Sequence, residues 1–338
     1  MTKPKKKKKL RLKAGIRKFS RQSLLIFLTV ALTVCGAAYC GALILLKGPS
    51  PTFSTLAVTT MMETRRGKAL AHFFFTDTQI EQMMSKNSIT ETTEVTVDAN
   101  TDYSIPADEK DKIDVYDVSG STITGKMMVV RDPSRVTLAV NTQMGSEYTS
   151  GFLVEDYVKS ENAVAGINAG GFDDPNGQGD GSIPLGVTIK DRQIVSGTPD
   201  DWGTLIGFNS HHHLIVGQMT GQQALDWDLV DAVTFSPVLI VNGEAAAITG
   251  TGGGLNPRTI IGQKADGSVL LLVIDGRQTT SLGASYDDCI KILLQYGAIN
   301  AANLDGGSST VMVYNGAIIN NVVSMYGDRK VPTAWIVK

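Results

Sequence analysis

Hydrophobic and polar positions divide the chain into three stretches. Residues 24–46 are uncharged and mostly apolar, and a helix of that length, rising 1.5 Å per residue, can cross the roughly 30 Å hydrocarbon core of a bilayer. Residues 47–110 are mixed, with a candidate helix near residues 72–84 and a polar segment after it. From residue 113 onward, short apolar runs are separated by turn residues, a pattern that predicts a β-rich domain.

This β-rich part contains many candidate strands and few candidate helices. Asp266-Gly267 and Asn315-Gly316 suit tight turns between successive strands. Because strands and helices do not alternate, we predict an α+β fold, a mixed β-sheet domain with few helices, preceded by a single N-terminal transmembrane helix. The candidate strands are residues 113–118, 126–131, 136–140, 163–167, 186–189, 205–208, 214–216, 238–241, 259–262, 269–274, 311–314 and 333–337.

The clearest helix pattern in this part covers residues 286–296. Ser285 can cap the N-terminus, and Asp288 lies three residues on, near the positive end of the helix dipole. Gly297 suits the position just after the helix. Cys289 falls on the apolar face, so we expect it to be a buried apolar residue and not a nucleophile.

Charge predicts how the chain crosses a membrane. Residues 1–46 contain eleven Lys or Arg and no acidic residue, and basic flanks of apolar spans usually stay in the cytoplasm. We therefore expect a cytoplasmic tail over residues 1–22, a transmembrane anchor over residues 23–46 and an extracellular remainder. A cleavable signal peptide is the alternative, but its apolar core is usually about 7–15 residues long.

The part beyond the apolar run is strongly acidic. All 33 acidic residues lie there against 20 basic residues, a net charge of about −13, which argues against nucleic acid as a partner. Cys289 is the single cysteine in this part, so no disulfide can form within it. We interpret residues 47–110 as a juxtamembrane stalk and residues 111–338 as one globular domain.

One octapeptide combines the groups of a ligand-binding loop. In Asn303-Leu304-Asp305-Gly306-Gly307-Ser308-Ser309-Thr310, two glycines follow a carboxylate and precede hydroxyls. Without Cβ atoms, the glycines let the backbone bend and approach a ligand closely. The alternative is a tight turn between helix and strand, which Asp305 merely stabilises.

Four further motifs place polar residues beside glycine or at the ends of candidate strands. They are Asn168-Ala169-Gly170-Gly171-Phe172, Arg258-Thr259, Asp275-Gly276-Arg277 and Asp328-Arg329. Arginine suits phosphate because its planar fork can bond two oxygens at once. Surface salt bridges are the alternative role for each arginine taken singly.

In this order, the five motifs resemble the phosphodiester glycosidase family, whose bacterial members are often labelled exopolysaccharide biosynthesis proteins. The resemblance covers residues 162–338. It departs from the family pattern at the inserted Ala169, at Ser308 directly after Gly307, and at Asp328, where Glu is common.

The resemblance implies hydrolysis of a GlcNAc-like sugar-1-phosphodiester to free sugar and phosphomonoester, on cell-surface polysaccharide or its precursors. From the residues themselves, we expect no cofactor. Asp305 is the first candidate for the catalytic carboxylate and Asp275 the second. Implied substrate-binding residues are Arg258, Arg277 and Arg329 for phosphate, with Asn168, Gly170, Gly171, Asn303, Gly306, Gly307 and Ser308 for sugar hydroxyls or phosphate oxygens.

Other functions remain open from the residues alone. The domain could be a non-catalytic polysaccharide-binding module, or a metal-dependent phosphodiesterase cutting the P–O side of the same bond. Neither candidate metal site is convincing: the adjacent His211, His212 and His213 would point to opposite faces of a strand, and the loop 173–180 departs from the known calcium-loop pattern. We expect no metal site.

The charge pattern makes a testable prediction about topology. In intact cells, external protease should remove the residues that follow about Lys47 and leave the basic N-terminal tail protected. Immunoblots against the two ends of the chain measure this. Protection of the C-terminal domain in cells whose other surface proteins are cleaved would contradict the predicted orientation.

Overall fold

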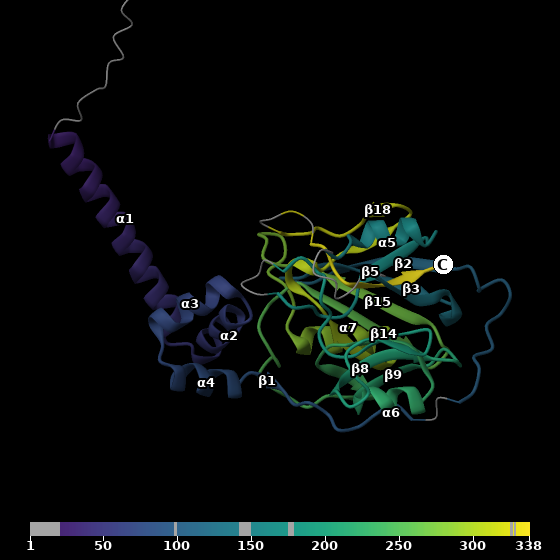
Figure 1. The fold of residues 1–338 in the computed structure, drawn as a ribbon. Helices are drawn as coiled ribbons and strands as arrows, with labels where there is room; N and C mark the ends of the chain where they lie inside the picture. The colour runs from purple at the N-terminus through teal and green to yellow at the C-terminus, as the bar shows by residue number, and fades with distance from the viewer. Residues whose placement is uncertain (1–20, 98–99, 142–149, 175–178, 325–326, 328) are drawn as a thin grey trace, which may run out of the picture. The chain divides into compact units, whose positions relative to one another are not determined.

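The computed structural model describes residues 21–338, apart from residues 98–99, 142–149, 175–178, 325–326 and 328. The chain forms two compact units, Met1–Pro51 and Thr52–Lys338. The described part of the first unit is dominated by α1 (Arg21–Lys47), drawn in purple in Figure 1. By length and composition, this helix could cross a membrane, as the apolar run predicted.

Antiparallel sheets build the second unit. The largest has seven strands in the order β12-β11-β16-β14-β15-β3-β2, and two others have five strands each, β18-β17-β5-β19-β4 and β7-β6-β10-β8-β9. Their bounds are β2 (Ile113–Ser119), β3 (Thr124–Val130), β4 (Val136–Val140), β5 (Ala165–Asn168), β6 (Thr188–Lys190), β7 (Gln193–Ser196), β8 (Trp202–Asn209), β9 (Leu214–Thr220), β10 (Leu229–Thr234), β11 (Val238–Val241), β12 (Glu244–Ala245), β14 (Arg258–Lys264), β15 (Val269–Ile274), β16 (Ala298–Leu304), β17 (Met312–Tyr314), β18 (Ala317–Ile318) and β19 (Thr333–Val337). The short β1 (Ser88–Ile89) and β13 (Ile248–Thr249) pair with each other.

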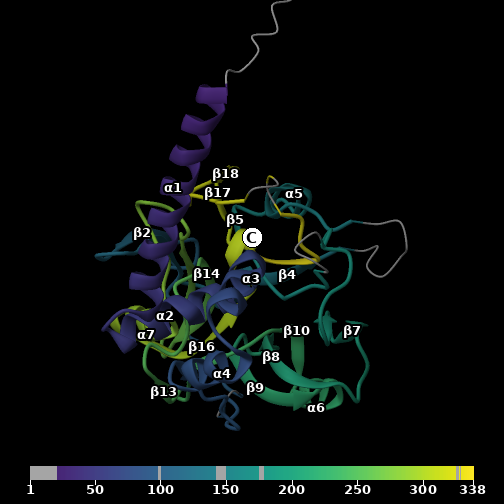
Figure 2. The ribbon, with the colours of Figure 1, turned by 90° about the vertical axis from the view of Figure 1, so that its left-hand side faces the viewer.

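The three larger sheets share one hydrophobic core, and helices cover their outer faces. In the core, Trp335 of β19 packs edge-on against Phe208 of β8, with ring centroids 5.4 Å apart. Outside, α7 (Tyr286–Gln295) lies on the seven-stranded sheet, α5 (Val154–Ser160) on the β5-containing sheet and α6 (Gly221–Asp226) on the third sheet. Figures 1 and 2 both show α5 and α6 on opposite sides of the unit.

This layering explains the sequence of β15. Val269, Leu271 and Val273 face the shared core, whereas Leu270 and Leu272 pack under α7. A strand covered on both faces needs no polar alternation, so it has a continuous apolar sequence.

Three helices begin the second unit: α2 (Pro51–Met62), α3 (Arg65–Phe74) and α4 (Asp77–Ser85). The segment after them contacts the sheets, since Thr96 Oγ1 donates to Leu214 O at 3.3 Å and accepts from Val216 N at 3.1 Å. Residues 52–110 therefore belong to the same compact unit as the sheets. Their role as a juxtamembrane stalk stays a prediction.

The predicted α+β fold with few helices is confirmed, and every strand pair among the described residues is antiparallel. The predicted helix is α7, whose Ser285 cap forms a capping box with Asp288. Cys289 is fully buried as expected, and burial raises the pKa of its thiol to about 12. Asn315 (φ 51°) and Gly316 (φ 76°) form the expected turn between β17 and β18.

Two local predictions were wrong. Residues 303–304 are the end of a strand, β16, and not part of a loop after the helix. Its sequence, AINAANL, is poor in the β-branched residues that favour strands, so its pairing with β14 decides its conformation. His211–His213 lie in the turn between β8 and β9, not on a strand, and His212 adopts φ 59°.

A buried carboxylate joins the two five-stranded sheets and supplies a test of the fold. Asp231 of β10, 4% exposed, accepts hydrogen bonds from Thr137 Oγ1 (2.6 Å) and Leu138 N (2.9 Å) of β4, and from Lys190 Nζ (3.1 Å) of β6. Because Asp231→Ala removes the buried acceptor that these donors share, we expect a loss of about 3–5 kcal/mol in unfolding free energy, measured by urea denaturation.

Asp191 is a matched control for this test, because its exposed carboxylate also lies near Lys190 Nζ, at 3.2 Å. Exposed pairs contribute about 0–1 kcal/mol, and asparagine tolerates the φ of 51° at this position, so Asp191→Asn should change stability little. Equal losses in the two variants would contradict the role assigned to Asp231.

Candidate functional site

The sequence motifs meet where several strands end. Antiparallel pairing puts Arg258, the first residue of β14, beside Ile274, the last of β15, and pairs Thr259 with Leu304 at the end of β16. In the neighbouring sheet, β5 ends at Asn168. The segments that follow β5, β15 and β16 and the segment that precedes β14 therefore share one end of the unit.

Asn168 connects these segments. Its fully buried amide donates from Nδ2 to Asp305 O at 2.5 Å, while its Oδ1 accepts from Thr259 Oγ1 at 2.9 Å and from Val311 N at 3.2 Å. All of these partners belong to the protein. Asn168 thus fixes the backbone at Asp305.

The Asp305 loop is also held by its backbone. Asp305 N donates to Ala169 O and Gly307 N donates to Pro257 O, both at 3.0 Å. A Cβ on Gly306 would lie 2.8 Å from Pro257 O, and Gly307 has φ +63°. Both positions require glycine, for close approach and for a left-handed backbone respectively.

Asp305 is a carboxyl group with a shifted pKa. Burial raises its pKa to about 6 and the nearby Asp174 contributes to the rise, whereas the hydrogen bond with Ser309 and the positive charge of Arg329 act in the opposite direction. A carboxyl group whose pKa lies near neutrality can exchange protons during a reaction at physiological pH.

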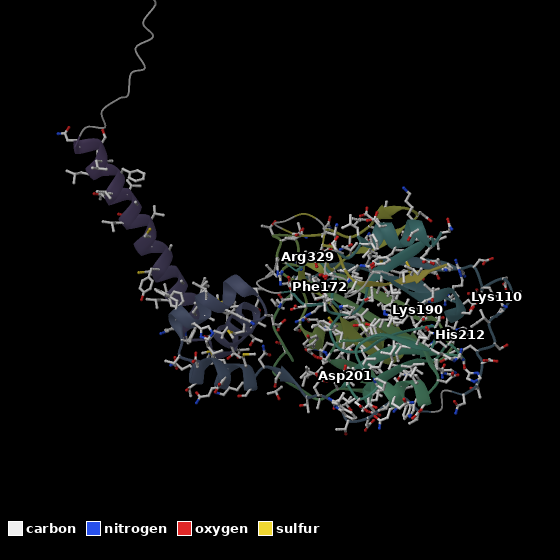
Figure 3. All side chains as sticks on the ribbon, viewed as in Figure 1. Lys110, Phe172, Lys190, Asp201, His212 and Arg329 are labelled. Carbon is white, nitrogen blue, oxygen red and sulfur yellow. The ribbon has the colours of Figure 1, made fainter. Side chains whose placement is uncertain are left out.

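Arg329 lies between an aromatic ring and an acid. Its guanidinium carbon is 5.1 Å from the Phe172 ring centroid, and NH2 is 3.0 Å from Asp174 Oδ1. Figure 3 labels Arg329 and Phe172 side by side at one end of the sheets. Asp328, which was predicted with Arg329, and residues 175–178 of the candidate loop 173–180 lie outside the described residues.

Arg277 is the exposed arginine of the cluster. It has φ 59°, and its NH2 group donates to Asn256 Oδ1 at 3.1 Å. The same NH2 group lies 3.3 Å from the position that a Cβ on Gly307 would take. Arg277 therefore borders the glycine pair beside Asp305.

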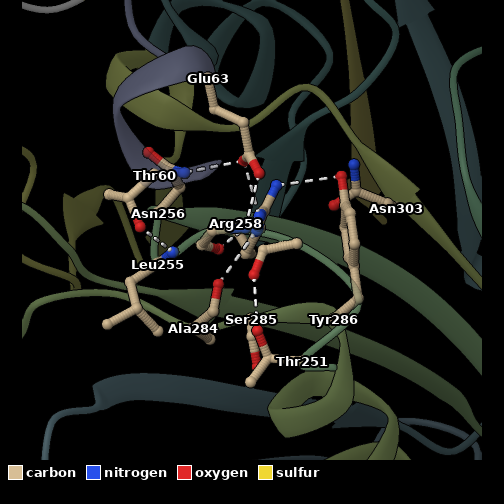
Figure 4. A network of polar contacts seen from close by, with 12 residues as sticks. Thr60, Glu63, Thr251, Leu255, Asn256, Arg258, Ala284, Ser285, Tyr286 and Asn303 are labelled. Atoms are coloured by element: carbon tan, nitrogen blue, oxygen red, sulfur yellow. Dashed lines mark hydrogen bonds and ion pairs between the residues drawn. The ribbon is translucent and has the colours of Figure 1, made fainter. Parts of the chain in front are cut away.

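Other predicted site residues are buried and bonded within the protein. Arg258 donates to Ala284 O, Tyr286 OH, Glu63 Oε2 and Gly254 O at 2.8–3.1 Å. Figure 4 labels Arg258 with the first three of these partners. Asp275 accepts from Asn320 Nδ2, from Asn321 N and Nδ2, and from Thr124 Oγ1.

Asn303 and the first glycine pair are also turned toward the protein. Asn303 Nδ2 donates to Ser236 O at 3.0 Å. Gly170 packs against Val233, and Gly171 against Phe235, with 2.9–3.0 Å from a built Cβ to the nearest atom. The structure thus brings Asp305, Gly306, Gly307, Ser308, Arg277 and Arg329 together. The other predicted residues that the structure describes are buried and contact other parts of the protein: Asn168, Gly170, Gly171, Arg258, Asp275 and Asn303.

Two residues of this region were missed. Asp174 was considered only as part of a loop, although its place two residues after Phe172 was a usable signal. Glu63 had no signal, because its partner Arg258 is 195 residues away in sequence. Among the described residues, no group of three or more His, Cys, Asp or Glu could hold a metal ion.

Comparison with known proteins identifies the family. A model of the phosphodiester glycosidase family matches residues 161–338, more than half of the chain. The chain belongs to the phosphodiester glycosidase family. Mouse N-acetylglucosamine-1-phosphodiester alpha-N-acetylglucosaminidase is 26% identical over 222 residues, 59% of this chain and 41% of that protein. An uncharacterized SPbeta prophage protein, YomE, of Bacillus subtilis is 40% identical over 67 residues, 20% of this chain and 10% of that protein.

A solved member of the phosphodiester glycosidase family has a similar fold. The catalytic domain of zebrafish N-acetylglucosamine-1-phosphodiester alpha-N-acetylglucosaminidase, auto-inhibited by its pro-peptide, aligns with a TM-score of 0.56 and 22% identity. The alignment covers 72% of this chain and 87% of the zebrafish chain. At this identity, the likeness shows the fold alone.

The raised pKa of Asp305 predicts how stability depends on pH. A folded-state pKa of about 6, above the usual 3.8, means that ionising Asp305 costs stability as pH rises from about 4 through 6. Asp305→Asn removes this cost, so the variant should gain on the order of 1–3 kcal/mol relative to the native protein between pH 4 and pH 7.5.

Urea denaturation of both proteins at the two pH values measures the difference. Asp191→Asn, at an exposed position, provides the control. A constant difference between the Asp305→Asn protein and the native protein across this pH range would contradict the shifted pKa.

Proposed function

We propose that this protein is a membrane-anchored extracellular hydrolase that cleaves a sugar-1-phosphodiester to free sugar and phosphomonoester. The observation that carries the proposal is the position of Asp305, with a pKa of about 6, among Arg277, Arg329 and the glycine pair. Family membership supports the reaction class. The GlcNAc-like sugar and the surface polysaccharide substrate follow from the resemblance of the motifs.

The arginines suit the leaving group of this reaction. As the bond between the anomeric carbon and the phosphate oxygen breaks, negative charge develops on the phosphate. Arg277, beside Gly307, would bind that phosphate and stabilise it in the transition state. Arg329, held by Phe172 and Asp174, would contribute the second positive charge.

Asp305 would act on the sugar. Above pH 6 its carboxylate can stabilise the oxocarbenium-like carbon, either as nucleophile or as base for the attacking water. Gly306 and Gly307 would let the substrate approach closely, and the Ser308 hydroxyl would bind one of its oxygens. Asp275 stays the second candidate carboxylate, and its bonds to Asn320 and Asn321 also suit a supporting role.

The location rests on α1 and on the basic residues before it. A helix of this length and composition supports membrane anchoring, and the basic flank supports a cytoplasmic N-terminus. We place the hydrolase unit outside the cell on that basis.

One observation favours polysaccharide binding without catalysis. Trp202, 63% exposed, lines a cavity of about 410 Å³ together with Glu91 and Gln218. An exposed indole ring beside polar side chains is suited to sugars. This cavity adjoins Gly171 through Leu185 and Phe235.

Product analysis distinguishes the candidate functions. The full-length protein in detergent is incubated with a sugar-1-phosphodiester, with and without EDTA, and the products are separated. The proposal expects free sugar and phosphomonoester, insensitive to EDTA. Sugar phosphate plus alcohol, or a metal requirement, would indicate a phosphodiesterase, and binding without turnover would indicate the non-catalytic module.

Substitution of Asp305 tests its catalytic role. Asp305→Asn keeps the shape of the side chain but removes its charge, so kcat should fall by about 10²–10⁴. In the native protein, kcat should rise with pH through about 6, because the ionised form is the active one. A folded Asp305→Asn protein that keeps most of its turnover would exclude Asp305 as the catalytic carboxylate.

A further inference from the structure

Glu63 is a carboxylate from outside the family domain that reaches the site. It follows α2 and precedes α3, whereas the family match begins at residue 161. Its Oε1 accepts from Gly254 N at 2.7 Å, and its Oε2 accepts from Asn256 Nδ2 at 2.7 Å and from Arg258 NH2 at 2.8 Å (Figure 4).

These contacts set the orientation of Asn256. A carboxylate can only accept, so Glu63 requires the NH₂ side of the Asn256 amide to face it. The carbonyl side then faces Arg277 and accepts from its NH2 group at 3.1 Å. Because Asn256 is only 3% exposed, solvent contributes little to this choice. Glu63, Asn256 and Arg277 thus form a directed chain ending beside Gly307.

The surrounding backbone holds Glu63 in place. Leu255 N donates to Thr60 Oγ1 at 2.9 Å, and a Cβ on Gly254 would lie 2.5 Å from Thr60 Cα. The end of α2 therefore docks closely on the loop that carries Asn256. Glycine at position 254 permits that approach.

We propose that Glu63 is a positioning residue: through Asn256 it holds the Arg277 guanidinium where it binds the substrate's phosphate. The inference rests on the proposed function of Arg277. It assigns to the helices after the membrane span a role in substrate binding. The alternative is that the Glu63 carboxylate occupies the place of the substrate's phosphate and inhibits the enzyme. In that case, removing its charge would raise activity.

Glu63→Gln tests the proposal with little change in shape. All three donors face the carboxylate, so a glutamine must turn its NH₂ group toward at least one of them. Asn256 loses its fixed orientation, and Arg277 loses its acceptor. We expect kcat/KM for the sugar-1-phosphodiester to fall roughly tenfold, through a higher KM and a lower kcat, because Arg277 contacts the phosphate in both the bound substrate and the transition state. The pH dependence near 6 should not change.

Two comparisons separate positioning from a loss of stability. Glu81→Gln, at an exposed position on α4, is the control and should match the native protein. The double variant Glu63→Gln/Asn256→Asp exchanges the carboxylate and the amide, so the acceptor for Arg277 returns and KM should recover. In an Arg277→Lys background, Glu63→Gln should add little to KM. Additive effects in that background, no rescue, or a gain of activity in Glu63→Gln would overturn the inference.

A readout without substrate separates this inference from the proposed function. Phenylglyoxal modifies accessible arginines, and peptide mass spectrometry follows the rate at Arg277. We expect that rate to change at least threefold in Glu63→Gln and to return in the double variant, even if no phosphodiester is cleaved. If the native enzyme turns over substrate but the rate of Arg277 modification is the same in Glu63→Gln, the positioning role is refuted and the proposed function stands.

Discussion

One buried amide holds the candidate site together. Asn168 ends a strand of one sheet, and its hydrogen bonds reach Thr259 of a second sheet, Val311, and the backbone of Asp305. An amide has a donor side and an acceptor side, so these contacts define its orientation as well as its position. A buried polar group in such a place costs free energy unless every bond is made. The position of the Asp305 loop therefore depends on the register of both sheets.

Two charged residues of the motifs are almost fully buried. Arg258 is 5% exposed and Asp275 is 3% exposed, and each is surrounded by protein partners. Buried charges are tolerated only when paired and hydrogen-bonded, and here those bonds tie the loops of the site to one another. Arg277 is exposed and Asp305 is partly buried, and both border the glycine pair. Arginine and aspartate thus have two roles here. The almost fully buried ones bond the loops of the site to one another, and the less buried ones border the place proposed for the substrate.

The sequence predicted the strands with strong apolar patterns and missed those without. The runs at β15 and β19 are continuous and apolar, so local composition was sufficient. β16 was missed because alanine and asparagine favour no strand by themselves, and its neighbours β14 and β11 determine its conformation. In the site, residue types identified the motifs but did not show which of their side chains are buried. Nothing local distinguishes the buried Arg258 from the exposed Arg277, since both lie at strand ends near glycine.

The candidate site extends beyond the residues that the family motifs cover, because one of its carboxylates is distant in sequence. The shared motifs lie within residues 161–338, a segment that contains every strand-end group near Asp305. Yet the carboxylate that pairs with Arg258 and orients Asn256 comes from residue 63, a separation that no periodicity or spacing can reveal. Arg258 is nearly inaccessible, so its charge requires an acid from some element packed on that face. In this chain the helices that follow the apolar span supply that acid, and the unit that forms the site therefore begins well before the motifs.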